Sequence, residues 1–495
     1  MERTRIVRKL EIVVLVTVCC SFCATATFAQ LQTPGKEPNQ PDYAELIPAD
    51  KLKKDLDFLF KTIEEVHPNM YAYVSQEKFK PLKEQLYERI SSPMKPLDFY
   101  KAVAPVVASL RNGHTFLQPP FEFFQNYAKA GGKYFPIEIQ INEESVILIK
   151  YQGPYALPLG AEVLTFDGIS AFEFLRKAAR YMPSEGKTYN LAMIQRQSML
   201  PIYLWLEKSN AKLLDLQLKT TDGRIEQFHL KALGYEELVN YQKSSPNKSE
   251  ATFKNNNTPY TYRYIPDYNV GLIEFNSFNN RKSFLEFLQS TFGKIRDQNI
   301  RELIIDIRKN PGGNSTLGDD LLKYLTSKPF SQFEKVDIKI SEQLLKEQPG
   351  IKKMFPESAM GSIVSVDTDL KLPEENHLRF GGKIFVLTGP ESASSSVSFA
   401  SVVKHFGIGT LIGSETIDTP VSYGDCIKGI LPNTELSFSV AAKRFVDAGG
   451  KENGRGIIPD YEVKQKAEDT AKGVDTVLQF TLNLIKESNS KAPGK

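Results

Sequence analysis

A cluster of serines in the C-terminal part of the chain has the residue type and the setting of a nucleophile. Six serines occupy ten positions between Ser392 and Ser401, in the stretch ESASSSVSFAS. A hydroxyl on the first turn of a helix lies beside N–H groups that the helix leaves unbonded, and these groups stabilise negative charge. Serine is also a common helix cap, so the cluster has a structural reading too. Chemistry here requires a base and a second oxyanion donor from elsewhere in the chain.

The chain offers few bases and one well-placed glycine turn. Its five histidines are His67, His114, His229, His377 and His405. Of these, His114 lies in SLRNGHTFLQPP, beside a glycine at the end of a predicted helix, on a loop of the kind that carries function. In NPGG (310–313), Gly312 and Gly313 follow an apolar strand and allow a backbone N–H to approach a ligand closely. The turn is therefore a candidate second oxyanion donor, with an ordinary turn as the alternative.

Other catalytic patterns are missing or are better explained by packing. Residues 401–404 (SVVK) match the SxxK pattern, but the two valines are needed for the helix core and no KTG motif accompanies them. The sequence contains no GxSxG, no HExxH and no histidine or cysteine cluster suited to a metal, so neither a metal nor a cofactor is expected. Cys426 lies in YGDCI without a neighbouring histidine and is interpreted as structural.

Periodicity predicts helices in the first part of the chain and short strands in the second. Residues 43–118 are interpreted as a small helical domain that carries His114, and its first helix has Asp50 available as N-cap. The apolar stripe of that helix consists of Leu52, Leu56, Leu59, Phe60 and Ile63. Residues 135–235 alternate in period two around Asp-Gly turns, which predicts a small β-rich module. Residues 242–258 are polar and of low complexity, and we interpret them as a linker.

The C-terminal part, residues 259–487, predicts an α/β core with a partly parallel sheet. The apolar run at 303–307 is typical of a strand buried on both faces, and the order strand, loop, helix recurs at 383–406. Such folds place their sites at the carboxyl ends of the strands. Both the NPGG turn and the serine cluster follow predicted strands, so we expect them to meet at one edge of the sheet.

The overall composition and the N-terminal residues limit the class of protein, its partners and its location. The 495 residues are 41% hydrophobic and carry a formal net charge of +3, which is ordinary for a globular protein and argues against a nucleic-acid partner. Residues 1–29 have a basic start, a short apolar run and small residues before Ala29, which predicts a signal peptide, and residues 30–42 form a linker. We therefore expect an exported protein, periplasmic or secreted, without a stable membrane span and without a lipid anchor.

Four sequence blocks resemble the tail-specific, or C-terminal-processing, serine proteases. LIIDIRKNPGG and ESASSSVSFASVVKHFGIGTLIGSET are similar to the two core signatures of that family. LPLGAEVLTFDGISAFEFL resembles its PDZ-like domain, and GRGIIPDYEV resembles its C-terminal motif. The blocks occur in the family's order over residues 43–487. The resemblance implies a helical domain, a PDZ-like module at 135–235 and an α/β protease core at 259–487.

The resemblance also implies the site residues. Ser394 aligns with the nucleophile, the Ser395 N–H with one oxyanion donor, and Gly312 or Gly313 with the other. Members with a Ser–Lys dyad carry a lysine after the GExT segment, but residues 416–420 (TIDTP) contain none. LRNGHTFL instead is similar to the branch that resembles the tricorn protease core, in which a histidine is the base, here His114. That branch uses a glutamate before its last motif, and Glu452 is offset from it by one residue.

The leading hypothesis is an exported serine peptidase that cleaves extended or unfolded polypeptides. His114 takes the proton of Ser394, the N–H groups hold the oxyanion, and Glu452 orients the histidine. If His114 is dispensable, Lys428 or Lys443 becomes the candidate base. The missing lysine, the offset glutamate and Val397 at the place of a motif glutamate also permit a catalytically degenerate protein that only binds peptides. A non-proteolytic acyl hydrolase on the same scaffold is the third hypothesis.

Overall fold

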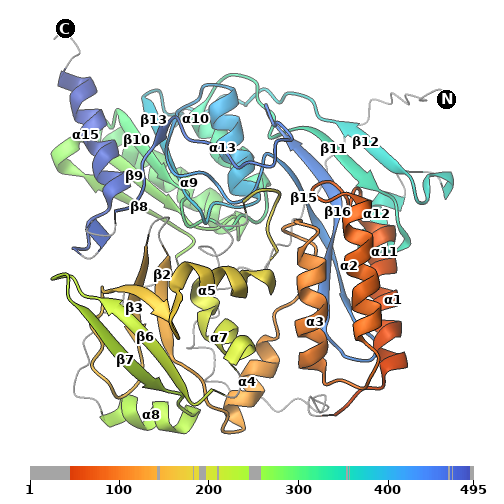
Figure 1. Cartoon of the computed structure of the whole chain (residues 1–495). Helices are drawn as coiled ribbons and strands as arrows, with labels where there is room; N and C mark the ends of the chain where they lie inside the picture. The colour runs from red at the N-terminus through yellow and green to blue at the C-terminus, as the bar shows by residue number, and fades with distance from the viewer. Residues whose placement is uncertain are drawn as a thin grey trace.

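The structure is a computed structural model of the whole chain. It describes residues 45–141, 145–181, 183–188, 197–208, 211–244, 258–352, 355, 357–466, 469–470 and 472–490. The predicted signal peptide (1–29) and linker (30–42) lie outside these residues, as does most of the predicted linker at 242–258. Three sheets and the helices around them make up the described part of the chain (Figure 1).

Three helices open the described chain and pack against a sheet formed by the C-terminal part. They are α1 (Ala49–Val66), α2 (Gln76–Arg89) and α3 (Pro96–Ala108). The predicted apolar stripe of α1 is buried throughout, but Asp50 is not the N-cap. That position belongs to Pro48, and Asp50 lies in the first turn, where its charge faces the positive end of the helix dipole.

The sheet under these helices is antiparallel and contains five strands in which β16 is central. The order is β1-β16-β11-β12, and β15 also pairs with β16. Its strands and the short helices beside it are β1 (Phe116–Leu117), β11 (Phe333–Lys339), α11 (Glu342–Glu347), α12 (Pro349–Lys352), η5 (Glu357–Ala359), β12 (Ile363–Asp367), β15 (Val421–Ile430) and β16 (Ser437–Asp447). Strand β1 comes from the N-terminal part and pairs with β16 through Phe116 and Ser439. The segment that carries His114 is therefore joined to the C-terminal sheet.

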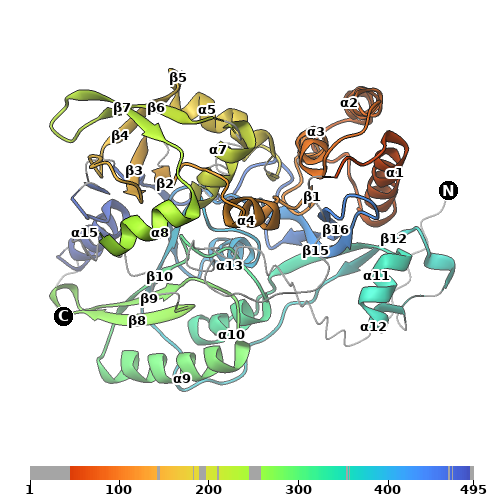
Figure 2. The same ribbon diagram turned by 90° about the horizontal axis from the view of Figure 1, so that it is seen from below.

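The β-rich module predicted from the sequence is a second antiparallel sheet of order β2-β3-β4-β6-β7, with β5 paired to β4 (Figure 2). Helix α4 leads into it, and α5 and α7 pack beside it. Its elements are α4 (Phe121–Lys129), β2 (Ile137–Ile141), β3 (Val146–Tyr151), β4 (Glu162–Phe166), β5 (Ile169–Ser170), α5 (Ala171–Ala178), η2 (Ala179–Tyr181), η3 (Gln197–Met199), α7 (Leu200–Lys208), β6 (Leu213–Lys219), β7 (Ile225–Lys231) and α8 (Tyr235–Ser244). Strands β2 and β7 form its edges.

The third sheet has the order β17-β14-β13-β10-β9-β8, and all its pairs are parallel except that of β8 with β9. Its elements are β8 (Tyr260–Ile265), η4 (Pro266–Tyr268), β9 (Val270–Phe275), α9 (Arg281–Asp297), β10 (Glu302–Asp306), α10 (Thr316–Leu325), β13 (Lys383–Thr388), α13 (Ser395–His405), β14 (Thr410–Gly413), β17 (Tyr461–Glu462) and α15 (Thr476–Ser490). Leu303 and Ile305 pack with α9, α10 and α13, whereas Ile304 packs with α15 on the other face. The alternation explains why this strand is apolar at consecutive positions.

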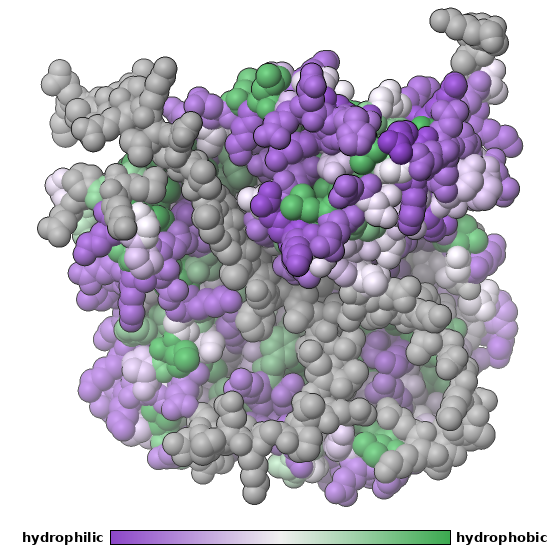
Figure 3. Space-filling model, turned by 180° about the vertical axis from the view of Figure 1, so that it is seen from behind, coloured by the Kyte–Doolittle hydropathy of each residue, from purple (hydrophilic) through white to green (hydrophobic). Residues whose placement is uncertain are grey.

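The architecture confirms the predicted fold class, a mixed α/β protein with N-terminal helices, a β-rich module and a partly parallel core sheet. Among the described residues no helix is both long enough and apolar enough to cross a membrane. The face shown in Figure 3 is mainly hydrophilic, and its hydrophobic residues form small separate groups.

Asp55 fastens the N-terminal helices to the C-terminal sheet, and its loss should destabilise the fold. Its side chain is fully buried and accepts four hydrogen bonds, from the N–H and side chain of Asn433 (3.0 and 2.7 Å) and from the N–H and hydroxyl of Thr434 (2.8 and 2.7 Å). Because Asp55→Ala leaves buried donors without acceptors, we expect it to lower the free energy of unfolding by about 3 kcal/mol. Chemical denaturation measures this. Asp57→Ala, which removes only an exposed bond to Tyr87, is the control and should cost less than about 1 kcal/mol. Equal losses in the two variants would contradict the assignment.

Candidate active site

The hydroxyls of the serine cluster separate into two kinds. Five donate hydrogen bonds that tie the loop and helix α13 to neighbouring segments. Their acceptors are Ile307 O for Ser392, Gly313 O for Ser395, Asn310 O and Ala393 O for Ser396, Asp447 Oδ1 for Ser398 and Ala448 O for Ser401. Ser394 is the only one of the six whose hydroxyl has no partner in the described part of the chain, and it is more exposed than the others. The structure therefore leaves Ser394 available for chemistry.

The backbone at Ser394 adopts a conformation that side-chain-bearing residues rarely take. Its φ is 52° and its ψ is −124°, and helix α13 begins at the next residue. The Ser394 N–H donates to Asp418 Oδ2 (2.7 Å), and its carbonyl accepts from Val397 N (2.8 Å). These bonds hold a strained turn at the carboxyl end of β13. As first residue of the helix, Ser395 has an N–H that the helix itself does not bond.

The glycine turn lies directly against the serine turn. A Cβ at Gly312 would lie 2.7 Å from Ser394 Cβ and 2.9 Å from Ser395 N, so only glycine fits. The Gly312 N–H donates to Asn310 Oδ1 (2.9 Å), which removes it as an oxyanion donor. The Gly313 N–H has no acceptor in the described part of the chain. Of the two glycines predicted for this role, Gly313 remains.

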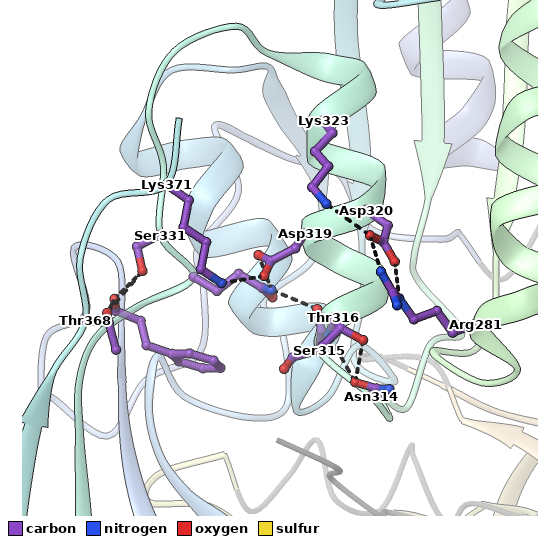
Figure 4. A network of polar contacts seen from close by, with 12 residues as sticks. Arg281, Asn314, Ser315, Thr316, Asp319, Asp320, Lys323, Ser331, Thr368 and Lys371 are labelled. Atoms are coloured by element: carbon purple, nitrogen blue, oxygen red, sulfur yellow. Dashed lines mark hydrogen bonds and ion pairs between the residues drawn. The ribbon is translucent and has the colours of Figure 1, made fainter. Parts of the chain in front are cut away.

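A polar network fixes the segment that follows the glycines (Figure 4). Asn314 Oδ1 accepts from the N–H and hydroxyl of Thr316 at the start of α10 (3.1 and 2.8 Å). Asp320 lies farther along α10, and its buried carboxylate forms a two-pronged ion pair with Arg281 at the start of α9 (2.6 and 3.0 Å). These contacts hold the beginning of α10, and with it the glycine turn, in one position.

The loop that carries His114 is fixed by the antiparallel sheet. The His114 carbonyl accepts from Cys426 Sγ (3.6 Å), and the buried Thr115 hydroxyl accepts from Ala441 N (3.1 Å). The His114 N–H donates to Asn112 Oδ1 (3.3 Å). His114 itself is partly exposed, as a base that must meet substrate should be. Burial raises the pKa of Cys426 to about 12, so this thiol is protonated and unsuited to attack.

A second histidine lies next to the same loop but has the wrong chemistry for a base. His67 is 2% exposed, packs against Tyr423 in a tilted arrangement with ring centroids 4.8 Å apart, and accepts the Asn69 N–H at Nδ1 (3.0 Å). Burial lowers the pKa of His67 to about 3 against the opposing effect of the nearby Asn112 side chain. A group with this pKa is a poor proton acceptor at neutral pH, which favours His114.

The residues named as alternative or supporting groups are engaged elsewhere. Lys443 is buried and forms an ion pair with the buried Asp425, and Lys428 lies exposed on β15. Glu452, predicted to orient the histidine, has a half-exposed side chain that pairs with Arg444 (2.8 Å). Its catalytic role stays a prediction.

Two carboxyl groups that sequence reasoning missed lie where the histidine loop meets the serine turn. Glu185 Oε2 accepts the Gly113 N–H (2.7 Å), and Asp418 accepts the Ser394 N–H. A Cβ at Gly113 would lie 3.1 Å from Glu185 Oε2 and 3.5 Å from Asp418 Oδ1, so the two carboxyls are neighbours. Asp418 lies in the TIDTP segment already noted for lacking a lysine. No motif pointed to Glu185.

A glutamine connects the β-rich module to the serine loop. Gln197 Oε1 accepts the Ile141 N–H at the end of edge strand β2 (2.5 Å), and Gln197 Nε2 donates to Glu391 Oε1 (3.3 Å). Burial raises the pKa of Glu391 to about 7, partly offset by the charge of Lys309. The module therefore contacts the chain three residues before Ser394.

Comparison with known proteins agrees with this arrangement. The family model "Peptidase family S41" matches residues 269–463. The crystal structure of a CPAF mutant superposes with a TM-score of 0.67 at 14% identity, covering 90% of this chain and 99% of that chain. Mature CPAF complexed with lactacystin gives a TM-score of 0.62 at 13% identity, covering 90% and 98%. These likenesses show a shared fold. No curated protein sequence matches the chain.

The matched segment contains the parallel sheet, the glycine turn and the serine turn, which are the parts that the sequence blocks single out. By this match, residues 269–463 are similar to peptidase family S41, and the fold of the chain is similar to that of CPAF.

Proposed function

We propose that the protein is an exported serine peptidase in which Ser394 is the nucleophile and His114 the base. The observation that carries this proposal is the division of the serine cluster, in which Ser394 alone has a hydroxyl without a partner in the described part of the chain, on a strained turn beside two N–H groups that also have no acceptor there. Such a hydroxyl is free to donate its proton to a base, as a serine nucleophile must. The similarity of residues 269–463 to a peptidase family supports peptides or proteins as substrates.

The reaction follows from these groups. His114 accepts the proton of Ser394 as its Oγ attacks a peptide carbonyl, and the N–H groups of Ser395 and Gly313 donate to the oxyanion. The imidazolium then gives the proton to the leaving amine, and an acyl-enzyme remains. Water attacks this ester by the same route in reverse, with His114 again as base, and frees the serine. Each transfer needs only groups of this chain and water.

The β-rich module at 135–235 is the proposed PDZ-like part, and it supports an extended substrate. Its edge strands β2 and β7 each have one unpaired side, to which a peptide adds by backbone hydrogen bonds. The contact through Gln197 places the end of β2 beside the serine loop. A peptide held along β2 therefore runs toward Ser394. The proposed export rests on residues 1–29, and N-terminal sequencing of the mature protein tests it.

Labelling by a fluorophosphonate tests the nucleophile and the base. We expect wild type to be labelled, Ser394→Ala to be unlabelled, and His114→Ala to label at least about a thousandfold more slowly, because a neutral hydroxyl without a base attacks poorly. Ser401→Ala, which removes a serine of the same helix with a bonded hydroxyl, should label within about threefold of wild type. Labelling that survives loss of Ser394 would exclude it as nucleophile.

The same assay separates the other hypotheses. Peptide binding without labelling of wild type would favour the degenerate binding protein. Cleavage of small esters without cleavage of peptides would favour an acyl hydrolase. A normal rate in His114→Ala would return Lys428 or Lys443 as the candidate base.

A methyl group on the glycine turn should disable the site. Because a Cβ at Gly312 would collide with Ser394 and with Ala393 O, and because φ at Gly312 is 94°, Gly312→Ala must displace the serine turn. We expect the labelling rate to fall about a hundredfold, as misplacements of about 1 Å do. Gly293→Ala on helix α9, where a Cβ meets nothing within 4 Å, is the matched control. A wild-type rate for Gly312→Ala would contradict the role of this contact.

A further inference from the structure

Two segments far apart in sequence each bring one carboxyl group to the junction of the histidine loop and the serine turn. Glu185 is fully buried and Asp418 is 7% exposed. They reach the junction from opposite sides, because Glu185 bonds the N–H of the residue before His114 and Asp418 bonds the N–H of Ser394. The two loops that must supply base and nucleophile thus meet across one carboxyl pair.

The backbone around Glu185 is fixed on both sides of the junction. The Gly186 N–H donates to Arg111 O (3.0 Å), at the start of the histidine loop, and the Lys187 N–H donates to Gly454 O (2.8 Å). A Cβ at Gly186 would lie 2.9 Å from Gly454 Cα, so the segment passes the 454 loop in close contact. The Glu185 carbonyl also accepts from the Thr188 hydroxyl (2.6 Å). Glu185 is therefore held in place independently of its own side-chain contact.

The backbone around Asp418 is also held by hydrogen bonds, one of which joins it to the serine loop. The Ile417 N–H donates to Ser392 O (3.2 Å), and the Thr416 N–H donates to Ile457 O (3.3 Å). The Thr416 hydroxyl donates to the Asp418 carbonyl (3.0 Å). The segment of Asp418 is therefore joined by a backbone hydrogen bond to the serine loop, and the segment of Glu185 is joined in the same way to the histidine loop.

The surroundings of the pair favour the neutral form of Glu185. The other titratable groups that interact with the two carboxyls are Tyr73, Tyr423, Cys426 and a further buried carboxyl, Asp447 on β16. None of these four side chains is a cation. Burial, and next the charge of Asp418, raise the pKa of Glu185 well above its ordinary value, and burial does the same for Asp447. A buried carboxyl beside another carboxyl is disfavoured in its charged form, so Glu185 holds its proton more tightly than an exposed glutamate does.

We propose that Glu185 and Asp418 are a positioning pair that assembles the catalytic site, with Glu185 accepting the Gly113 N–H and Asp418 accepting the Ser394 N–H. The proposal rests on the proposed function of Ser394 and His114. It gives the pair the task of holding base and nucleophile in register, which differs from the orientation of His114 that the sequence predicts for Glu452. Because both carboxyls act through backbone N–H groups, they are positioning residues and not catalytic ones.

The proposal predicts a difference between two variants of the same residue. Glu185→Gln keeps an oxygen that accepts the Gly113 N–H and resembles the neutral acid, whereas Glu185→Ala removes the acceptor. We expect Glu185→Gln to be labelled by fluorophosphonate within about threefold of wild type at pH 7, and Glu185→Ala to be slower by about tenfold to a hundredfold. With a peptide substrate the loss should fall on kcat and leave KM nearly unchanged.

The pH dependence tests the neutral state of Glu185. A carboxyl whose pKa is raised in the folded protein stabilises it at low pH, and this stability is lost as the pH rises from the ordinary value near 4.5 through the raised pKa. In wild type Glu185 then becomes charged in its buried position beside Asp418, so labelling and Tm should both fall on the alkaline side. Glu185→Gln cannot ionise, and its Tm advantage over wild type should grow with pH.

Matched controls and a readout without activity complete the experiment. Glu334 accepts the Gly449 N–H (2.8 Å) on the surface, so Glu334→Gln and Glu334→Ala make the same changes to a glutamate that bonds a backbone N–H away from the site. Both variants should label within about twofold of wild type.

Hydrogen exchange measures the protection of the histidine loop directly. Amides of 111–115 should lose protection in Glu185→Ala but keep it in Glu185→Gln. Asp418→Asn, which keeps an acceptor but loses the charge, should keep protection of the serine turn.

The outcomes are distinct. Unchanged labelling and unchanged protection in Glu185→Ala would overturn the positioning role. A Glu185→Gln variant as slow as Glu185→Ala, or with the alkaline fall of wild type, would overturn the neutral assignment. Absence of labelling in wild type would instead refute the proposed function, and the exchange and Tm measurements would still decide whether the pair holds the loop.

Discussion

One buried asparagine joins the ends of three neighbouring strands, and the candidate site depends on it. Asn310 is fully buried in the turn after β10. Its Nδ2 donates to Phe275 O at the end of β9 (2.8 Å), its Oδ1 accepts the Gly312 N–H, and its carbonyl accepts from Ala393 N (3.0 Å) and from the Ser396 hydroxyl (2.9 Å), both after β13. An aspartate could not donate to Phe275 O, and an apolar residue would leave several buried groups unpaired. The glycine turn and the serine turn touch because Asn310 ties both to one edge of the sheet, the first through its side chain and the second through its carbonyl.

The number of serines in the cluster follows from the buried acceptors around it. These acceptors are backbone carbonyls and one carboxylate to which strand pairing supplies no donor, and a buried acceptor without a donor costs free energy. Small hydroxyl side chains donate to these acceptors without needing space. Five serines do so, whereas the sixth, Ser394, is partly exposed and its hydroxyl has no partner in the described part of the chain. The abundance of serine is a packing solution, and the single unbonded hydroxyl is the exception within it.

The sequence predicted the parts of this structure that are encoded locally. The stripe of α1, the doubly buried strand at 303–307 and the meeting of NPGG with the serine cluster all follow from periodicity and from the geometry of parallel sheets. The first residue of a helix is less well encoded, and the expected cap Asp50 lies in the first turn of α1, after the actual cap Pro48. The carboxyl pair could not be predicted, because Glu185 and Gly113 lie 72 residues apart and Glu185 belongs to no recognisable motif. The ion pair of Glu452 with Arg444 was not predicted either, because it depends on how the chain turns after β16.

The attachment of the histidine loop decides how the site is assembled. His114 precedes a strand, β1, that is part of the same sheet as β16, and its carbonyl is bonded from β15. Asp447, the last residue of β16, accepts a hydrogen bond from Ser398 on the serine helix. His114 and the serine helix are thus connected through one antiparallel hairpin, formed by β15 and β16. A hinge motion could separate His114 from Ser394 only by breaking strand pairs of this sheet. The remaining freedom lies in the loop residues between Arg111 and His114, and it is this short segment that the buried Glu185 holds by its one hydrogen bond to Gly113.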